Sequence, residues 1–239
     1  MSVNIIRIGA DPEGFIVRKD GKFISAAGLF PGTKKTPHPL DGGAVQVDGV
    51  ALEYNINAAS SEDEFEKYNS IVLSQLTELV HKVLDKDHSL KFTPVARFDK
   101  EDWEKINPEA KVLGCDPDYN FEGEVNVNPT DLLEHSTLRT AAGHIHIGWT
   151  KVSDPKDARH FADCRYIARK FFEAKPELYV PTSQEEKERL KYYGGRASWR
   201  PKTYGVELRS PSNMWVAHEE TRRKMYNVTR TLFKKFTGM

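Results

Sequence analysis

Acidic, imidazole and guanidinium side chains recur at alternate positions in four short segments of this chain. The segments span residues 9–15, 52–56, 143–149 and 205–209, and apolar residues occupy most of the positions between the polar ones. Side chains of a strand point alternately to opposite faces of a sheet, so each segment predicts a strand with an apolar back and a polar front. Taken alone, any one of them is typical of an ordinary solvated sheet face.

The polar fronts of these segments contain the residue types that bind divalent cations. They are Asp11, Glu13, Glu53, Asn55, His144, His146, Glu207 and Arg209. An exposed sheet face more commonly carries Lys, Thr and Ser, whereas carboxylates and imidazoles are metal ligands. If the four strands are neighbours, their acids repel one another unless cations lie between them. The pattern therefore predicts a concave sheet face lined by metal ions.

The balance of ligand types indicates which metal this face would hold. A set dominated by carboxylates, with one or two imidazoles, favours Mg²⁺ or Mn²⁺. Zinc bound through His144 and His146 is an alternative, but the excess of oxygen ligands argues against a closed structural zinc site.

Three further arginines lie close to the polar segments. Arg139 precedes the histidine segment, and Arg196 and Arg200 lie just before the segment that contains Glu207. Guanidinium groups bind phosphate or carboxylate oxygens in pairs, so acids, metal ions and arginines in one cleft are typical of phosphoryl transfer. A surface ion pair explains each arginine equally well on its own. The chain has no Walker A sequence and no Gly-x-Gly-x-x-Gly after a strand, so ATP would bind outside those loops.

The elements that must position these residues are strands and helices in alternation. Strands are expected at 3–8, 15–18, 22–25, 44–55 (two strands meeting at Asp48-Gly49), 142–149 and 204–210. Helices are expected at 62–84 and 184–192, each opened by a capping box, at 155–173 with Asp154 as N-cap, and at 214–236. Most connections between strands have hairpin length. We therefore expect an α+β fold with a curved, mainly antiparallel sheet and helices packed on its apolar face.

Composition limits the class of protein further. The 239 residues are 38% hydrophobic, which excludes a disordered chain, and residues 1–239 are expected to form one domain. Lys+Arg and Asp+Glu are 35 each, which argues against a generic nucleic-acid binder. No membrane span or signal peptide is evident. Cys115 and Cys164 predict free thiols and hence the cytoplasm, of a cell or of a virus-infected host cell.

Four motifs together carry a family resemblance. Residues 9–15 are similar to a Gly-x-Glu-x-Glu-Phe strand, 47–55 to a second acidic strand, 142–146 to a Gly-x-His-x-His strand and 206–211 to a Glu-x-Arg-x-Pro strand. In this order and spacing they resemble the glutamine synthetase and glutamate–cysteine ligase superfamily of carboxylate–amine ligases, in particular the compact phage-type amidoligases. The resemblance implies a glutamine synthetase-like catalytic domain that uses ATP and Mg²⁺ or Mn²⁺.

The resemblance also implies roles for individual residues. The metal-ligand positions fall on Asp11, Glu13, Glu53, His144 and Glu207. His146 would approach the nucleotide phosphates, and Arg139, Arg196 and Arg200 would contact phosphate or a substrate carboxylate. Catalysis would depend on Arg209 at the transferring phosphoryl group, on Glu53, and on Asp48 as the acceptor of the amine proton. The substrates would be a small-molecule or peptide carboxylate and an amine acceptor.

Two residues depart from the family pattern. Asp11 stands where a glutamate is usual, so its carboxylate reaches about one methylene less far. Pro12 has no N–H to donate to a ladder, which predicts an edge strand or a bulge at that point.

Two other functions compete with the ligase. A metal-dependent hydrolase or oxygenase would use His144, His146 and Glu207 as a two-histidine, one-carboxylate site, but leaves Asp11, Glu13 and Glu53 without a task. A non-catalytic viral structural or binding protein would use the polar face only as a surface.

Overall fold

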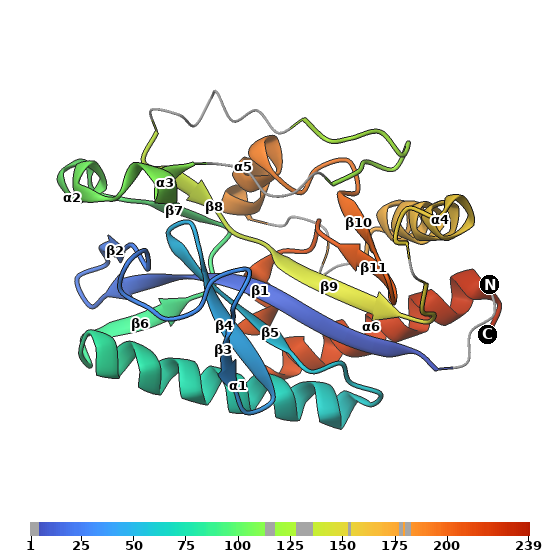
Figure 1. The fold of residues 1–239 in the computed structure, drawn as a ribbon, viewed down its shortest axis with the longest axis horizontal. Coiled ribbons are helices and arrows are strands. Elements are labelled where there is room, and N and C mark those ends of the chain that lie inside the picture. The colour runs from blue at the N-terminus through green and yellow to red at the C-terminus, as the bar shows by residue number, and fades with distance from the viewer. Residues whose placement is uncertain (1–4, 113–117, 128–135, 153, 177–178, 180–182) are drawn as a thin grey trace.

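The structure, a computed structural model, describes residues 5–112, 118–127, 136–152, 154–176, 179 and 183–239. Its main feature is a nine-stranded sheet in the order β10-β11-β9-β1-β5-β4-β3, with β2 and β6 also paired to β1 (Figure 1). Strands β7 and β8 form a separate pair, and all these pairings are antiparallel. The fold is α+β with a large antiparallel sheet and packed helices, as expected.

Groups of strands are separated by helices along the described chain. The strands are β1 (Arg7–Arg18), β2 (Phe23–Ile24), β3 (His38–Leu40), β4 (Gly43–Asp48), β5 (Ala51–Ile56), β6 (His88–Lys91), β7 (Val95–Arg97), β8 (Leu138–Thr140), β9 (Gly143–Gly148), β10 (Trp199–Lys202) and β11 (Gly205–Leu208). The helices are α1 (Glu62–Val83), α2 (Lys100–Lys105), α3 (Pro108–Lys111), α4 (Ala158–Ala174), α5 (Gln184–Tyr192) and α6 (Glu219–Thr237), with a 3₁₀ turn at Asn213–Val216.

The main hydrophobic core lies on one face of the sheet. The alternate residues of the central strands, such as Ile8, Leu52, Ile145 and Val206, are fully buried there. They pack against apolar residues of α1, α4 and α6, such as Leu76, Ile167 and Phe233. Because period two sends every second side chain to the other face, this packing fixes the direction in which the polar residues point.

Strand β1 is longer and more central than expected. It runs unbroken through residues that were expected to form two strands, and it lies between β9 and β5. The expectation of an edge strand at Pro12 is therefore wrong, and the one extra residue near this point lies in the partner segment and not in β1. From Gly14 to Ile8 the strand advances six residues, while its partners advance seven, from Leu52 to Ala59. Pro12 lies in this interval, where the ladder on that side is interrupted and no N–H is needed.

Two helices begin at the capping boxes found in the sequence, whereas a third helix does not begin at its expected N-cap. Ser61 and Ser183 accept hydrogen bonds from the backbone N–H groups of Glu64 and Glu186, at the starts of α1 and α5. Helix α4 begins at Ala158 and is capped by Asp157, so the expected start at Asp154 is wrong. Asp154 instead accepts a hydrogen bond from the Lys156 N–H, which closes a turn before the helix.

The last expected helix is interrupted. The 3₁₀ turn at 213–216 is followed by α6, whose N-cap is His218 in extended conformation. Side chains satisfy carbonyls at the break, since the Arg222 guanidinium donates to Val216 O (2.8 Å) and the Thr221 hydroxyl donates to Trp215 O (2.7 Å). The local geometry therefore replaces the helical hydrogen bonds that a continuous helix would make.

Cys164 is buried and free, whereas Cys115 lies outside the described residues. Within the described ranges, no helix combines the length and the apolar composition needed to span a bilayer.

A buried ion pair joins α1 to α6 behind the sheet. The Arg222 guanidinium donates two hydrogen bonds to the Glu66 carboxylate, at 2.8 and 2.6 Å. We expect Arg222→Met to lower the free energy of unfolding by about 3–5 kcal/mol, because it leaves a carboxylate buried without its partner. The double variant Glu66→Met/Arg222→Met should lose much less. Urea unfolding measures both.

Arg223→Met is the matched control for this prediction. Arg223 makes partly exposed ion pairs with Glu62, Asp63 and Glu219, so its loss should cost at most about 1 kcal/mol. Equal losses in Arg222→Met and Arg223→Met would contradict the assigned role of the buried pair.

Candidate metal centre

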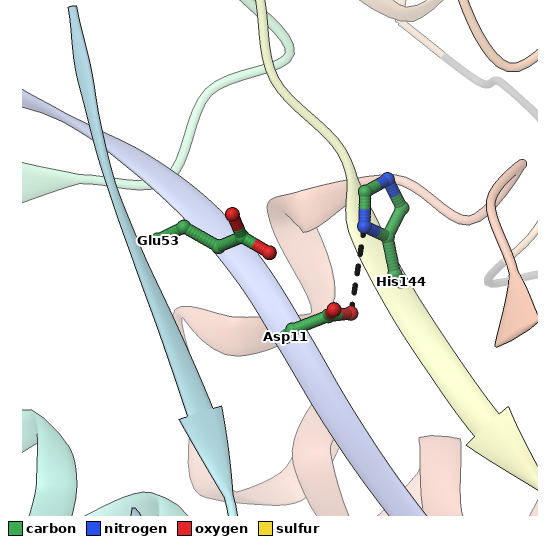
Figure 2. A group of neighbouring side chains, drawn as sticks. All are labelled: Asp11, Glu53 and His144. Carbon is green, nitrogen blue, oxygen red and sulfur yellow. Dashed lines mark ion pairs between the residues drawn. The ribbon is translucent and has the colours of Figure 1, made fainter. Parts of the chain in front are cut away.

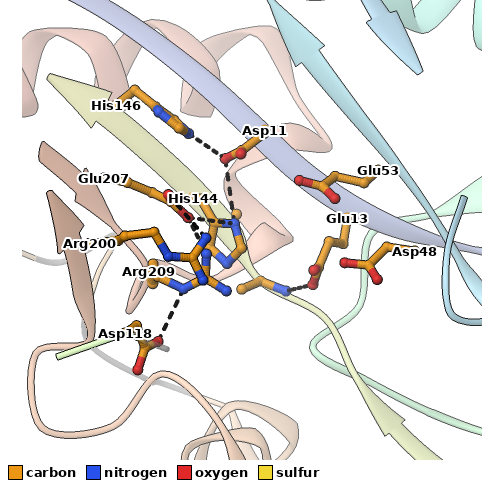
Figure 3. A network of polar contacts seen from close by, with 12 residues as sticks. Asp11, Glu13, Asp48, Glu53, Asp118, His144, His146, Arg200, Glu207 and Arg209 are labelled. Atoms are coloured by element: carbon orange, nitrogen blue, oxygen red, sulfur yellow. Dashed lines mark hydrogen bonds and ion pairs between the residues drawn. The ribbon is translucent and has the colours of Figure 1, made fainter. Parts of the chain in front are cut away.

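The four polar segments become adjacent strands, in the order β11-β9-β1-β5. The register places Glu207 beside His146, Asp11 beside His144, and Glu13 beside Glu53. Figure 2 shows the Asp11, Glu53 and His144 side chains converging above the sheet, and Figure 3 shows the wider network. Residues separated by up to 196 positions in the chain thus meet on one sheet face.

Asp11 lies at the centre of this group. Its Oδ1 atom is 2.7 Å from His146 Nε2 and 3.4 Å from His144 Nδ1. Within the described part of the chain, these three buried atoms and Glu207 Oε2 make no hydrogen bond of acceptable geometry, although they lie at ion-pair distances. Buried polar atoms nearly always have a hydrogen-bond partner or bind an ion. Their convergence is therefore the feature that a cation would best explain.

Three sets of ligand atoms among the described residues are close enough to share one cation. In each set, all the atoms lie within 4.8 Å of one another; the sets are Asp11–Glu53–His144, Asp11–His146–Glu207 and Glu13–Asp48–Glu53. Carboxylate oxygens dominate every set, and two of them add a single imidazole. This donor set fits Mg²⁺ or Mn²⁺ better than a closed zinc site. All five expected ligands lie in these sets, together with Asp48 and His146.

Electrostatics differ along this row of acids. Burial raises the pKa of Glu53 well above its usual value, and the charges of Asp11 and Glu13 raise it further. Burial also raises the pKa of Glu13, with a contribution from Asp48. Asp11 behaves oppositely: burial alone would raise its pKa, but His146 and His144 hold it well below the usual value. In the metal-free site, the carboxyl groups at the Glu13–Glu53 end therefore lose their protons at a higher pH than free carboxyl groups do.

Cationic side chains surround Glu207 at the other end of the row. Burial opposes its ionisation, but the Arg209 guanidinium holds the pKa of Glu207 below its usual range. The Lys202 ammonium is 2.7 Å from Glu207 Oε2, and Arg200 is 3.6 Å from it. Arg209 also donates through Nε to Asp118 at 3.1 Å. A buried guanidinium is thus held in a fixed orientation beside the acids (Figure 3).

Arg200 joins the cluster, but Arg139 and Arg196 make their described contacts elsewhere. The Arg139 guanidinium donates to the carbonyls of Ser136, Leu138 and Lys111, and it stacks 4.1 Å from the Trp103 ring. Arg196 is exposed and pairs with Glu122. Neither arrangement brings the guanidinium to the acids, and the expected contact of these two arginines with phosphate or a substrate carboxylate stays a prediction.

The sequence did not predict four of the side chains that contact the acids, histidines or Arg209 at this site, namely Gln46, Lys202, Asp118 and Tyr193. Gln46 donates to Glu53 at 2.7 Å, and it precedes Asp48 by two residues, so strand periodicity could have identified it. Lys202 follows Arg200 by the same interval. Asp118 and Tyr193 come from irregular segments, where no local pattern indicates which residue reaches a distant strand.

A cleft of about 850 Å³ adjoins the cluster at the start of β1. Asp11 and His146 lie at one end, and the lining also includes Arg7, Asn55, Lys151 and Tyr204. Gly9 and Gly148 belong to the same lining on neighbouring strands. A Cβ atom at either glycine would make only ordinary contacts, at 3.7 and 3.6 Å, so packing within the protein does not require them to be glycine.

Comparisons with known proteins identify a fold similarity. No protein-family model matches the chain, and no curated protein sequence matches it either. The structure is similar to a bifunctional glutathione synthetase from Pasteurella multocida, with a TM-score of 0.50 and 13% sequence identity. The match covers 95% of this chain and 38% of that chain, so this chain spans little more than a third of the other protein's length. At this identity the match shows a shared fold.

The raised pKa of Glu53 predicts a pH-dependent stability. Between the unfolded and the raised folded pKa values the folded state binds more protons, so stability falls as pH rises through that range. In EDTA at pH 8, Glu53→Gln should therefore raise the midpoint of thermal unfolding, because it removes the cost of burying an ionised carboxylate. Each 1 kcal/mol gained in the free energy of unfolding corresponds to a rise of about 2–4 °C. The difference in midpoint should shrink as the pH is lowered below 4.5, because the carboxyl becomes protonated in both states.

With added Mg²⁺ or Mn²⁺ at pH 8, wild type should have the higher unfolding midpoint and Glu53→Gln the lower one. The cation stabilises only the protein that keeps the carboxylate. Glu78→Gln, an exposed change on α1, serves as control. A Glu53→Gln protein that is less stable than wild type in EDTA at every pH would contradict the electrostatic interpretation.

Proposed function

We propose that this chain is an ATP- and Mg²⁺-dependent carboxylate–amine ligase that forms an amide or peptide bond. The observation that carries the proposal is the convergence of buried carboxylate and imidazole atoms, several without a hydrogen bond, beside the fixed guanidinium of Arg209. The fold similarity to a glutathione synthetase supports the same class of enzyme. Because the chain spans only part of that protein's length, the activity is proposed from the site.

The chemistry needs activation of a carboxylate. A carboxylate does not condense with an amine at neutral pH, because oxide would have to leave. Its oxygen therefore attacks the γ-phosphorus of ATP, the bond to ADP breaks, and an acyl phosphate forms. The amine then attacks the acyl carbon, phosphate leaves, and an amide remains after the amine loses a proton. Divalent cations, when bound, neutralise the phosphate charges in such a transfer.

The position of each residue suggests its part in this reaction. Asp11, Glu13, Glu53, His144 and Glu207 would hold the cations. Arg209 would stabilise charge on the transferring phosphoryl group, and its contacts with Asp118 and Glu207 pre-orient it for that task.

Asp48 is the proposed acceptor of the amine proton. It ends β4, pairs with Lys34 at 3.0 Å, and is more exposed than Glu53 and Glu207, so an incoming amine can reach it. Glu53, which shares a set of ligand atoms with it, would hold a cation beside the reacting groups.

The cleft beside Asp11 is the proposed site of the nucleotide. His146 and Asp11 would face the phosphates, and the nucleoside would extend along the cleft toward Arg7 and Lys151. Gly9 and Gly148 leave the sheet face bare at this point, which makes room for a flat ring. Arg200 adds positive charge at the phosphate end.

The geometry favours the ligase over the alternatives. Among the described residues, each set of ligand atoms with a histidine contains only one, so the set expected for a hydrolase or oxygenase, His144, His146 and Glu207, does not come together as one group. A purely structural sheet face would be solvated, whereas His144, Glu207 and Arg209 are buried. The finer assignment, a single glutamine synthetase-like domain of the phage amidoligase type acting in the cytoplasm, rests on the order of the four motifs.

Nucleotide binding can be tested before any substrate is known. Wild-type protein should show a raised unfolding temperature with ATP plus Mg²⁺ and much smaller shifts with either alone. At a ligand concentration 100 times Kd the stabilisation is about 2.7 kcal/mol. No shift with the combination, at millimolar ATP and Mg²⁺, would exclude the nucleotide–metal site.

Turnover can be tested with hydroxylamine, which traps acyl phosphates as hydroxamates. With ATP, Mg²⁺ and a panel of amino-acid and dipeptide carboxylates, hydroxamate should form together with ADP. Glu13→Gln should lower the rate about 100-fold or more, since it removes a proposed ligand. The amide oxygen can still accept the Ala142 N–H bond, so the fold should persist. Full activity in Glu13→Gln, with the exposed Glu101→Gln as control, would refute the metal assignment.

A further inference from the structure

His144 is held between the cluster of acids and a tyrosine. Its Nδ1 atom faces Asp11 Oδ1 at 3.4 Å and Glu207 Oε1 at 3.8 Å, while its Nε2 atom is 3.0 Å from the Tyr193 hydroxyl. The residue is 2% exposed, so solvent has little access to either nitrogen. The hydroxyl of Tyr193 therefore decides how the outer side of this ring is satisfied.

Tyr193 is linked through its neighbours to the segment after β11 that carries Arg209. It follows α5, and its backbone N–H donates to Arg189 O at 2.8 Å. The fully buried Arg189 guanidinium in turn donates to Ser210 O at 2.6 Å. The Tyr193 ring also lies 5.3 Å from the Arg209 guanidinium. One aromatic side chain thus supports both a proposed metal ligand and the proposed phosphoryl-stabilising residue.

We propose that Tyr193 is a positioning residue that sets the tautomer of His144. A neutral imidazole carries its proton on one nitrogen only. When the Tyr193 oxygen accepts the Nε2 proton, the lone pair of Nδ1 is directed at the position shared with Asp11 and Glu207, where a cation can use it. Outer hydrogen bonds of this kind orient metal-binding histidines and make them better ligands. The inference rests on the proposed metal site.

The second histidine repeats the arrangement with its nitrogens exchanged. His146 faces Asp11 through Nε2, at 2.7 Å, and its Nδ1 atom contacts the Tyr204 hydroxyl. Tyr204 lies between β10 and β11, whereas Tyr193 follows α5. Two unrelated segments therefore supply the same phenolic support to the two imidazoles. This repetition favours a role at the site over incidental packing.

The test is a double-mutant cycle between Tyr193 and His144, read by Mn²⁺ binding. Tyr193→Phe keeps the ring beside Arg209 and removes only the hydroxyl, so it should weaken Mn²⁺ binding about 10- to 100-fold. In a His144→Gln background the same change should have little effect, because the imidazole that it orients is gone. Tyr192→Phe, the neighbouring change, should bind as wild type does.

A spectroscopic measurement accompanies the cycle. In ¹⁵N-histidine spectra at a Mg²⁺ concentration that saturates wild type, His144 should carry its proton on Nε2. Tyr193→Phe should show a mixture of ring forms under the same conditions. Unfolding midpoints in EDTA should agree closely for wild type, Tyr193→Phe and Tyr192→Phe.

The outcomes separate the two proposals. If wild type binds no Mn²⁺, the proposed metal site fails and this inference falls with it. If wild type binds Mn²⁺ and Tyr193→Phe binds equally well, the role of Tyr193 alone is refuted. An equal loss from Tyr193→Phe with and without His144, whether from misfolding or from another cause, also refutes it.

Discussion

Repulsion between buried carboxylates on neighbouring strands is the constraint around which this sheet face is arranged. Like charges placed opposite each other destabilise a pair of strands, and Glu13 lies directly beside Glu53. At the Glu207 end the protein supplies compensation itself, through Arg209, Lys202 and Arg200. At the Glu53 end the described hydrogen bond comes from the neutral amide of Gln46. The described ion pair at that end is the partly exposed one between Lys34 and Asp48, so fewer positive charges face the acids there than around Glu207.

Apolar packing on the opposite face of the sheet offsets the unfavourable free energy of bringing these acids together. Burial of apolar side chains is the dominant favourable term in folding, and the strands that carry the acids present Ile8, Leu52, Ile145 and Val206 to the core. A strand cannot rotate its acids away without also exposing these residues. The packing of α1, α4 and α6 thus keeps the acidic side chains close to one another despite their mutual repulsion.

Much of this face could be predicted from the sequence, because strand periodicity is local. Alternation was enough to place Asp11, Glu53, His144 and Glu207 on one side of their strands, and two capping boxes located helix starts. What local patterns could not provide was the partner across space. Arg139 lies next to the histidine strand in the chain, yet its guanidinium binds distant carbonyls, and Asp118 reaches Arg209 from an irregular segment. The path of β1 through Pro12 depended on the interruption of its ladder with β5, which no local pattern in the sequence indicates.

Strand β1 pairs with β2, β5, β6 and β9, and this has a consequence for motion. Amides shared by so many ladders exchange with deuterium only when a large part of a structure opens at once. Asp11 and Glu13 thus sit on the strand that has the most pairing partners in the described sheet. We expect adjustment to ligands of different size at the periphery of the sheet, such as the end of β4 that bears Asp48 and the segment after α5.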